Sequence, residues 1–275
     1  MTDRKIFFTD LDGTLLNDKK EVTPGNREAI NKALAAGHKI VISTGRALPS
    51  ALDQAKKIGL MMDGCFIISY NGAVIYDIGK EKVIHSSSVP VEYIRYLFDR
   101  GHEMDIHMQT YTSTQVVAER DREELHRYTG IQNLEYKVVD RIEDEVPEGS
   151  PKALAVAYGD KETLQKYWDK IRTWAEGKID IFFSGVDYLE LVAPGVSKGN
   201  AVKIICDYLE TSVENTVSAG DAENDIEMLK ATHIGAVMVN AQPQMYQYGN
   251  YITEHDNNHD GVAEIINKFI LQGGI

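Results

Sequence analysis

The sequence predicts an α/β protein in which a doubly wound parallel sheet is interrupted by an inserted α+β unit. Up to Ser69, short apolar segments alternate with helical ones, which is the pattern of strands joined by crossover helices. After Asn71-Gly72 the pattern changes to a hairpin, followed by helices and short strands, and from Ser197 the first pattern resumes. A chain of 275 residues is long enough for both units. We expect the parallel unit over residues 1–83 and 192–275, and the inserted unit over residues 84–191.

The first part of the parallel unit predicts three buried strands and two helices. The strands are apolar runs at residues 6–9, 39–43 and 66–69. The helix at residues 24–36 has Thr23 as its cap, Pro24 in its first turn and Gly37 beyond its end. A second helix is expected over residues 49–58. This strand–helix alternation favours a parallel sheet covered on both faces.

The inserted unit predicts a mixture of helices and antiparallel strands. It is preceded by a hairpin of residues 73–76 and 82–85, separated by Gly79-Lys80. Helical patterns cover residues 91–100, 120–129 and 161–175. Alternating patterns cover residues 152–158, 181–184 and 188–192. The sequence therefore predicts a second sheet of antiparallel strands in this unit.

The last part of the chain returns to the parallel unit. Helices are expected over residues 200–209, 225–229 and 261–271. Strands are expected over residues 216–219 and 234–239.

Composition and charge narrow the class of partner. The hydrophobic content of 43% and charged content of 26% are ordinary for a globular protein, and the formal charge is −13. An acidic chain without basic patches disfavours nucleic-acid and anionic-membrane partners. Cys65 and Cys206 are far apart and form no metal-binding pattern. With no signal peptide or apolar membrane span in the sequence, we expect a cytoplasmic location.

Two carboxylates, Asp10 and Asp12, directly follow the first predicted strand. Sites of open α/β sheets lie at the carboxyl ends of the strands, so these acids are placed where chemistry is expected. Like charges this close repel unless a cation or a shared proton relieves them. The pair therefore indicates a metal-binding site, a role in proton transfer, or both.

Three further groups fall at strand ends or helix starts of the parallel unit. They are Ser43-Thr44-Gly45-Arg46, Lys198 and the run Gly220-Asp221-Ala222-Glu223-Asn224-Asp225. Carboxylates from two loops suit Mg²⁺. Hydroxyl and backbone N–H groups ahead of a helix suit phosphate oxygens, and a lysine adds positive charge. Together these groups predict a phosphoryl-transfer site with a carboxylate nucleophile.

The order and spacing of these motifs resemble the haloacid dehalogenase superfamily of phosphatases, in the Cof-type group with a large inserted cap of type IIB (C2). The matching segments are residues 10–14, 44–46, 71–72, 198–199, 220–225 and 260–263. The resemblance implies a Rossmann-like catalytic core over residues 1–83 and 192–275. It also implies a cap over residues 84–191 that determines substrate specificity. Ala222 and Val239 stand where the group commonly has glycine.

The resemblance also implies the role of each acid. Asp10 would be the nucleophile that forms an aspartyl-phosphate. Asp12 would be the general acid for the leaving alcohol and then the base for the attacking water. Mg²⁺ would be held by Asp10, the backbone carbonyl of Asp12 and Asp221. Asp225 would act on the metal through water or by orienting the other groups.

Further residues are expected to contact the substrate. The phosphate oxygens would be held by Leu11 and Gly45 through their backbones and by Thr44, Lys198 and Asn224 through their side chains. Arg46 and Asn71 are candidate substrate contacts.

The predicted function is Mg²⁺-dependent hydrolysis of phosphomonoesters of small metabolites. Sugar phosphates are the expected substrates, and phosphorylated cofactors such as pyridoxal phosphate or flavin mononucleotide stay open. One alternative is a phosphomutase on the same core, which returns the phosphoryl group to the substrate. A second alternative, of another class, is a phospho-receiver domain used in signalling. Such a domain needs only ~120 residues and no inserted unit, so the length of this chain disfavours it.

Overall fold

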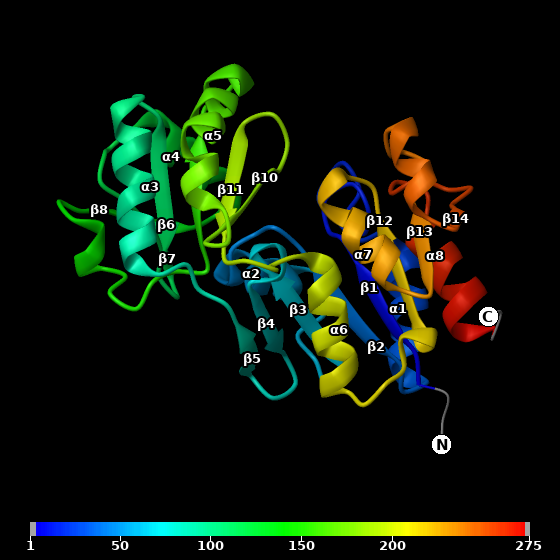
Figure 1. The fold of residues 1–275 in the computed structure, drawn as a ribbon. Helices are drawn as coiled ribbons and strands as arrows, with labels where there is room; N and C mark the ends of the chain where they lie inside the picture. The colour runs from blue at the N-terminus through cyan, green and yellow to red at the C-terminus, as the bar shows by residue number, and fades with distance from the viewer. Residues whose placement is uncertain (1–3, 273–275) are drawn as a thin grey trace. The chain divides into compact units, whose positions relative to one another are not determined.

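The computed structural model describes residues 4–272, which fold into two compact units (Figure 1). The first unit contains residues up to 44, residues 52–85 and residues from 197 onward. The second contains residues 45–51 and 86–196. Helix α2 (Leu48–Lys57) therefore begins in the second unit and ends in the first.

The first unit is built on an eight-stranded sheet with the order β14-β13-β12-β1-β2-β3-β4-β5. Its strands are β1 (Ile6–Thr9), β2 (Lys39–Ser43), β3 (Cys65–Ser69), β4 (Val74–Asp77), β5 (Lys82–Ser86), β12 (Thr216–Gly220), β13 (Ile234–Val237) and β14 (Tyr251–Ile252). The strands from β14 to β3 pair in parallel, and β4 pairs antiparallel to β3. The predicted hairpin thus extends the parallel sheet at one edge.

Helices cover both faces of this sheet. They are α1 (Pro24–Ala35), α6 (Lys198–Tyr208), α7 (Ile226–Ala231) and α8 (Gly261–Ile265), and α8 continues into a wider π-helical segment at Ile266–Leu271. Helices α6 and α7 pack on the face that carries Ile6 and Phe8 of β1. Helices α1 and α8 contact each other and lie on the opposite face (Figure 1). Every residue of β1 is buried, as expected of a central parallel strand.

The second unit is built on a six-stranded sheet with the order β10-β11-β9-β6-β7-β8. Its strands are β6 (His107–Tyr111), β7 (Gln115–Ala118), β8 (Glu135–Val138), β9 (Lys152–Val156), β10 (Asp180–Phe183) and β11 (Tyr188–Val192). Its helices are α3 (Val91–Glu103), α4 (Glu123–Gln132) and α5 (Lys161–Ala175). Helices α3 and α5 bury Phe98 and Tyr167 against one face of the sheet. Short 3-10 segments of the whole described chain lie at Tyr70–Gly72, Ile142–Asp144, Val213–Asn215, Glu223–Asp225 and Pro243–Tyr248.

The predicted fold class is confirmed, and two details differ. Strands β7 and β8 pair in parallel, unlike the antiparallel neighbours of the rest of this sheet. Helix α4 joins them, and a crossover helix returns the chain in the same direction. Residues 45–51 pack with the second unit although we expected them in the first. No helix among residues 4–272 combines the length and apolarity needed to cross a bilayer.

Candidate active site

Three of the predicted site residues follow the carboxyl ends of three neighbouring parallel strands. Asp10 follows β1, Thr44 follows β2 and Asp221 follows β12. Strand β1 lies between the other two, and the backbone N–H of Asp10 donates to the carbonyl of Ala219 at 3.0 Å. Because the strands are parallel, all three residues reach the same edge of the sheet.

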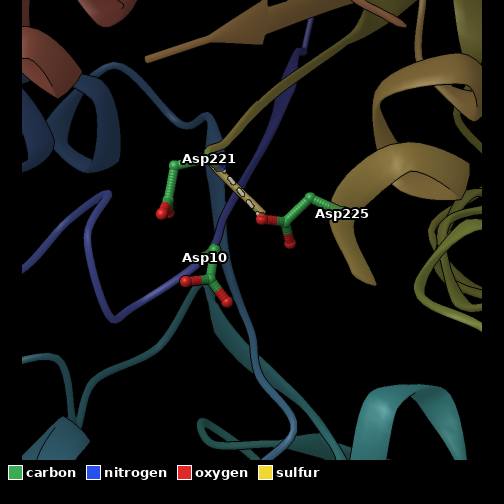
Figure 2. A group of neighbouring side chains, drawn as sticks. All are labelled: Asp10, Asp221 and Asp225. Atoms are coloured by element: carbon green, nitrogen blue, oxygen red, sulfur yellow. Dashed lines mark hydrogen bonds between the residues drawn. The ribbon is translucent and has the colours of Figure 1, made fainter. Parts of the chain in front are cut away.

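Three carboxylates meet at this edge. Asp10, Asp221 and Asp225 each offer one oxygen, and these oxygens all lie within 4.8 Å of one another. Figure 2 shows the three side chains together, Asp10 from the segment after β1 and Asp221 and Asp225 from the segment after β12. Asp10 is 7% exposed and Asp225 is fully buried. The donor set fits a hard divalent cation such as Mg²⁺, which prefers carboxylate oxygens.

A buried lysine supplies part of the opposite charge. The Lys198 Nζ lies 2.6 Å from Asp10 Oδ1 and 2.6 Å from Asp225 Oδ1. Lys198 begins helix α6, and the N–H of Asn200 donates to the side chain of Ser197, the cap of that helix. Burial acts against the charge of Lys198, but the carboxylates of Asp10 and Asp225 outweigh it and raise its pKa. The ammonium group therefore stays charged at every ordinary pH.

One lysine does not neutralise three acids, and the pKa values reflect this. Burial raises the pKa of Asp10 well above its usual range, and Asp225 and Asp221 add to the rise while Lys198 opposes it. Burial likewise raises the pKa of Asp221 to about 6, against a hydrogen bond that lowers it. The site holds more negative charge than it can stabilise alone, which is the electrostatic condition for binding a cation.

Asp225 organises the loop that carries Asp221. Its Oδ2 accepts from the backbone N–H groups of Asp221 at 3.0 Å and Ala222 at 3.1 Å, and the first of these bonds is drawn in Figure 2. Since Oδ1 is engaged by Lys198, both oxygens of Asp225 already have partners. Ala222 contributes its backbone at an extended φ of −123°. Glycine is not needed for that conformation, which explains why alanine is tolerated here.

Thr14 is a site residue whose role the sequence did not predict. Its Oγ1 donates to Asp221 Oδ1 at 2.6 Å and fixes that carboxylate. The glycine at position 13 leaves space for the Asp221 carboxylate, because a Cβ there would lie 2.6 Å from Asp221 Oδ2. The φ of Gly13 is +88°, a backbone conformation that favours glycine. The position of Thr14 was a signal, since it closes the first motif four residues after Asp10.

Asp12 has a different environment from Asp10. Its side chain is 38% exposed and its Oδ1 lies 2.7 Å from the Nζ of Lys20. Lys20 sits in a turn with a φ of 62°, next to Asn17, whose side chain accepts from the backbone of Glu21. No pattern in the sequence pointed to Lys20, because this pair depends on how the turn folds back.

The remaining predicted residues lie around the acids. Leu11 is buried beside Asp10, and Thr44 accepts through its carbonyl from the backbone N–H of Asn71 at 3.1 Å. The Asn224 Nδ2 donates to Asn71 Oδ1 at 3.3 Å. Gly45 and Arg46 belong to the segment that packs with the second unit, and their roles stay predictions.

The sequence matches the haloacid dehalogenase-like hydrolase family over residues 7–266. The chain belongs to that family, so the predicted superfamily is confirmed. One relative is "Putative phosphatase YxeH" of Bacillus subtilis (strain 168), 29% identical over 272 residues, covering 97% of this chain and 98% of the relative. Another is 5-amino-6-(5-phospho-D-ribitylamino)uracil phosphatase YcsE of the same strain, 29% identical over 277 residues, covering 98% and 97%.

A solved structure supports the same conclusion. A haloacid dehalogenase-like hydrolase from Bacteroides thetaiotaomicron has a TM-score of 0.88 and 27% identity, covering 96% of this chain and 99% of that one. The family, the relatives and this structure agree with the prediction of a phosphatase of the haloacid dehalogenase superfamily, which is confirmed as the enzyme class.

Proposed function

We propose that this phosphatase hydrolyses phosphomonoesters of small metabolites in two steps, through a phosphorylated Asp10. The observation that carries the proposal is the position of Asp10. Its carboxylate is buried at the carboxyl edge of the sheet and hydrogen-bonded to Lys198 in the midst of two other acids. Such an arrangement orients one carboxylate oxygen while leaving the other for attack on phosphorus.

Mg²⁺ is the proposed cofactor. It would be held by Asp10, the backbone carbonyl of Asp12 and Asp221, with Asp225 and Thr14 orienting the ligands. When bound, it supplies the positive charge that brings a phosphate dianion against carboxylates.

In the first step, an oxygen of Asp10 forms a bond to phosphorus and the bond to the leaving oxygen breaks. The carboxyl group of Asp12 gives its proton to that oxygen, so the leaving group departs as an alcohol. In the second step, the Asp12 carboxylate takes a proton from water. The water oxygen then bonds to phosphorus, the bond to Asp10 breaks, and inorganic phosphate is released.

The exposure of Asp12 suits this double role. An ion pair as exposed as Asp12–Lys20 contributes little to stability, so the carboxyl group can leave Lys20 at small cost. Burial would instead fix the group, as it does for Asp225.

The phosphoryl oxygens are the proposed ligands of Lys198, Asn224, Thr44 and the backbone N–H groups of Leu11 and Gly45. An ammonium group has three donors, and Lys198 uses two of them on Asp10 and Asp225. The third is available for a phosphoryl oxygen, with its charge held next to the nucleophile.

Sugar phosphates are the proposed substrates, with the second unit acting as the cap that selects among leaving groups. The name of YcsE supports this class, since its substrate carries a phosphate on a ribityl chain. Arg46 remains a candidate contact to the leaving group.

Phosphate release from a panel of sugar phosphates and phosphorylated cofactors, with and without Mg²⁺, tests the proposal. We expect release that depends on Mg²⁺ and is abolished by Asp10→Asn, whose amide is not a nucleophile. Release by the Asp10→Asn variant at the wild-type rate would rule out Asp10 as the nucleophile. Conversion of a hexose phosphate to an isomer without phosphate release would instead identify a mutase.

A further inference from the structure

The turn between β3 and β4 has an unusual backbone. Tyr70, Asn71 and Gly72 have φ values of 51°, 55° and 116°, so three consecutive residues lie in left-handed conformations. Non-glycine residues with such φ values carry strain of the kind that collects at functional sites. The strain needs a cause in the surrounding structure.

Two segments of the active site hold this turn in place. The backbone N–H of Asn71 donates to the carbonyl of Thr44 at 3.1 Å. Gly72 lies against the backbone of Ser197, the residue before Lys198, and a Cβ at Gly72 would lie 2.4 Å from the Ser197 carbonyl oxygen. Asn71 is therefore fixed between the segments that carry two of the proposed phosphate ligands.

The side chain of Asn71 is only half satisfied. Asn71 is 2% exposed, and its Oδ1 accepts from the Nδ2 of Asn224 at 3.3 Å. Its own Nδ2 is buried and has no hydrogen-bond partner among residues 4–272. A buried donor without a partner is costly, and native proteins retain few of them. A strained backbone that holds an unpaired donor beside Asn224 indicates a ligand with an oxygen to offer.

We propose that Asn71 is a phosphate-binding residue that donates its Nδ2 to an oxygen of the substrate's phosphoryl group. Through Oδ1 it also orients the Asn224 carboxamide. An amide N–H cannot ligate a cation, so Mg²⁺ is not its partner. Its neighbours Thr44, Asn224 and Lys198 are themselves proposed phosphate ligands, so an anionic oxygen is the expected acceptor. This inference rests on the proposed function and adds a specific donor to it.

Two substitutions distinguish the loss of the Asn71 Nδ2 donor from damage to the fold. Asn71→Gly removes the side chain and keeps the backbone, because glycine accepts a φ of 55° without strain. Asn71→Asp keeps the shape and the acceptor for Asn224 but removes the donor. Asn133→Gly is the matched control, since Asn133 has a φ of 51° at the end of α4 and is exposed in the second unit.

The readouts are competitive inhibition by inorganic phosphate, kcat and KM with p-nitrophenyl phosphate, and the melting temperature. For Asn71→Gly we expect the inhibition constant of phosphate to rise about tenfold to a hundredfold, the loss typical of one hydrogen bond to a charged group. Asn71→Asp should bind phosphate more weakly still, since a carboxylate repels phosphate. Asn133→Gly should bind phosphate as the wild type does.

The outcomes distinguish this inference from the proposed function. If the wild type releases no phosphate from any substrate, the proposed function fails. If the wild type is active and Asn71→Gly binds phosphate as tightly as Asn133→Gly, Asn71 is not a ligand. Loss of cooperative melting in both Asn71 variants would also overturn the proposal, because the residue would then serve the fold alone.

Discussion

Asp221 should make the metal-free protein less stable as the pH rises. Burial raises the pKa of this carboxyl from 3.8 to about 6 in the folded state. Below about pH 4 the group is protonated whether the chain is folded or not, so it carries no penalty. Above about pH 6 it is charged in both states, and the folded state bears the cost of a buried charge. A change in pKa of this size corresponds to about 3 kcal/mol.

The Asp221→Asn variant removes that titration while keeping the shape of the side chain. Without metal, we expect the unfolding free energy of the variant, measured relative to that of the wild type, to rise by about 3 kcal/mol as the pH goes from 4 to 7.5. Mg²⁺ at pH 7.5 should stabilise the wild type and have little effect on the variant, because binding needs the carboxylate. Asp207→Asn, an exposed change on α6, is the control and should show neither effect.

Urea unfolding followed by far-UV circular dichroism is the suitable assay. Tryptophan fluorescence would report directly on the second unit alone, because Trp168 and Trp174 both lie in its helix α5. If the difference in unfolding free energy between wild type and Asp221→Asn stays constant from pH 4 to pH 7.5, the reasoning from burial is wrong.

Three further substitutions test other contacts. Lys198→Met should lower the free energy of unfolding by about 3–5 kcal/mol, because it leaves buried carboxylates without their partner. This loss, measured by urea unfolding, should be smaller at pH 5 than at pH 8. Lys152→Met should lower the unfolding free energy by a similar amount, because it breaks the buried 2.8 Å ion pair with Glu190, and adding Glu190→Gln should restore most of the loss. Tryptophan fluorescence can follow the unfolding of this unit. A double variant no more stable than Lys152→Met would contradict the charge argument. Gly13→Ala should lower phosphatase activity at least about tenfold with the fold retained, because its Cβ displaces the Asp221 carboxylate; an unchanged dependence of activity on Mg²⁺ would show that the loop adapts.

The fold was predictable where chemistry and periodicity coincide. Strands β1 and β2 are short apolar runs that end at motif residues, so their positions and the edge they form followed from the sequence. The strands β4 and β5 followed from apolar runs on either side of Gly79-Lys80, whereas the antiparallel pairing of β4 with β3 was not predicted. Strand β14 was not predicted either, because two residues carry no periodic pattern and the pairing is set by β13 alone.

The site was predictable in its motifs and not in its long-range contacts. The acids and Lys198 were identified from motif spacing. The contact between Asn71 and Asn224 joins residues 153 positions apart, and only the folded sheet brings them together. Lys20 was missed for a related reason, since its pair with Asp12 depends on a turn that no local pattern specifies.

The segment of residues 45–51 illustrates the limit of assigning units from sequence. It follows Thr44 directly and leads into α2, so continuity of the chain assigned it to the first unit. Its packing with the second unit includes a hydrogen bond from Ser50 to Gln132, and that preference depends on side chains contributed by α4.

The most direct test of the account is detection of a phosphate ester on Asp10. The Asp12→Asn variant should form the phosphorylated enzyme and hydrolyse it slowly, because the base for the second step is lost. The variant is mixed with p-nitrophenyl phosphate and Mg²⁺, quenched in acid, digested and analysed by mass spectrometry. We expect a phosphoryl group on the peptide that contains Asp10, absent when Asp10→Asn is added to the variant. Turnover by the wild type with no phosphorylated peptide in the variant, or with the group on another residue, would contradict it.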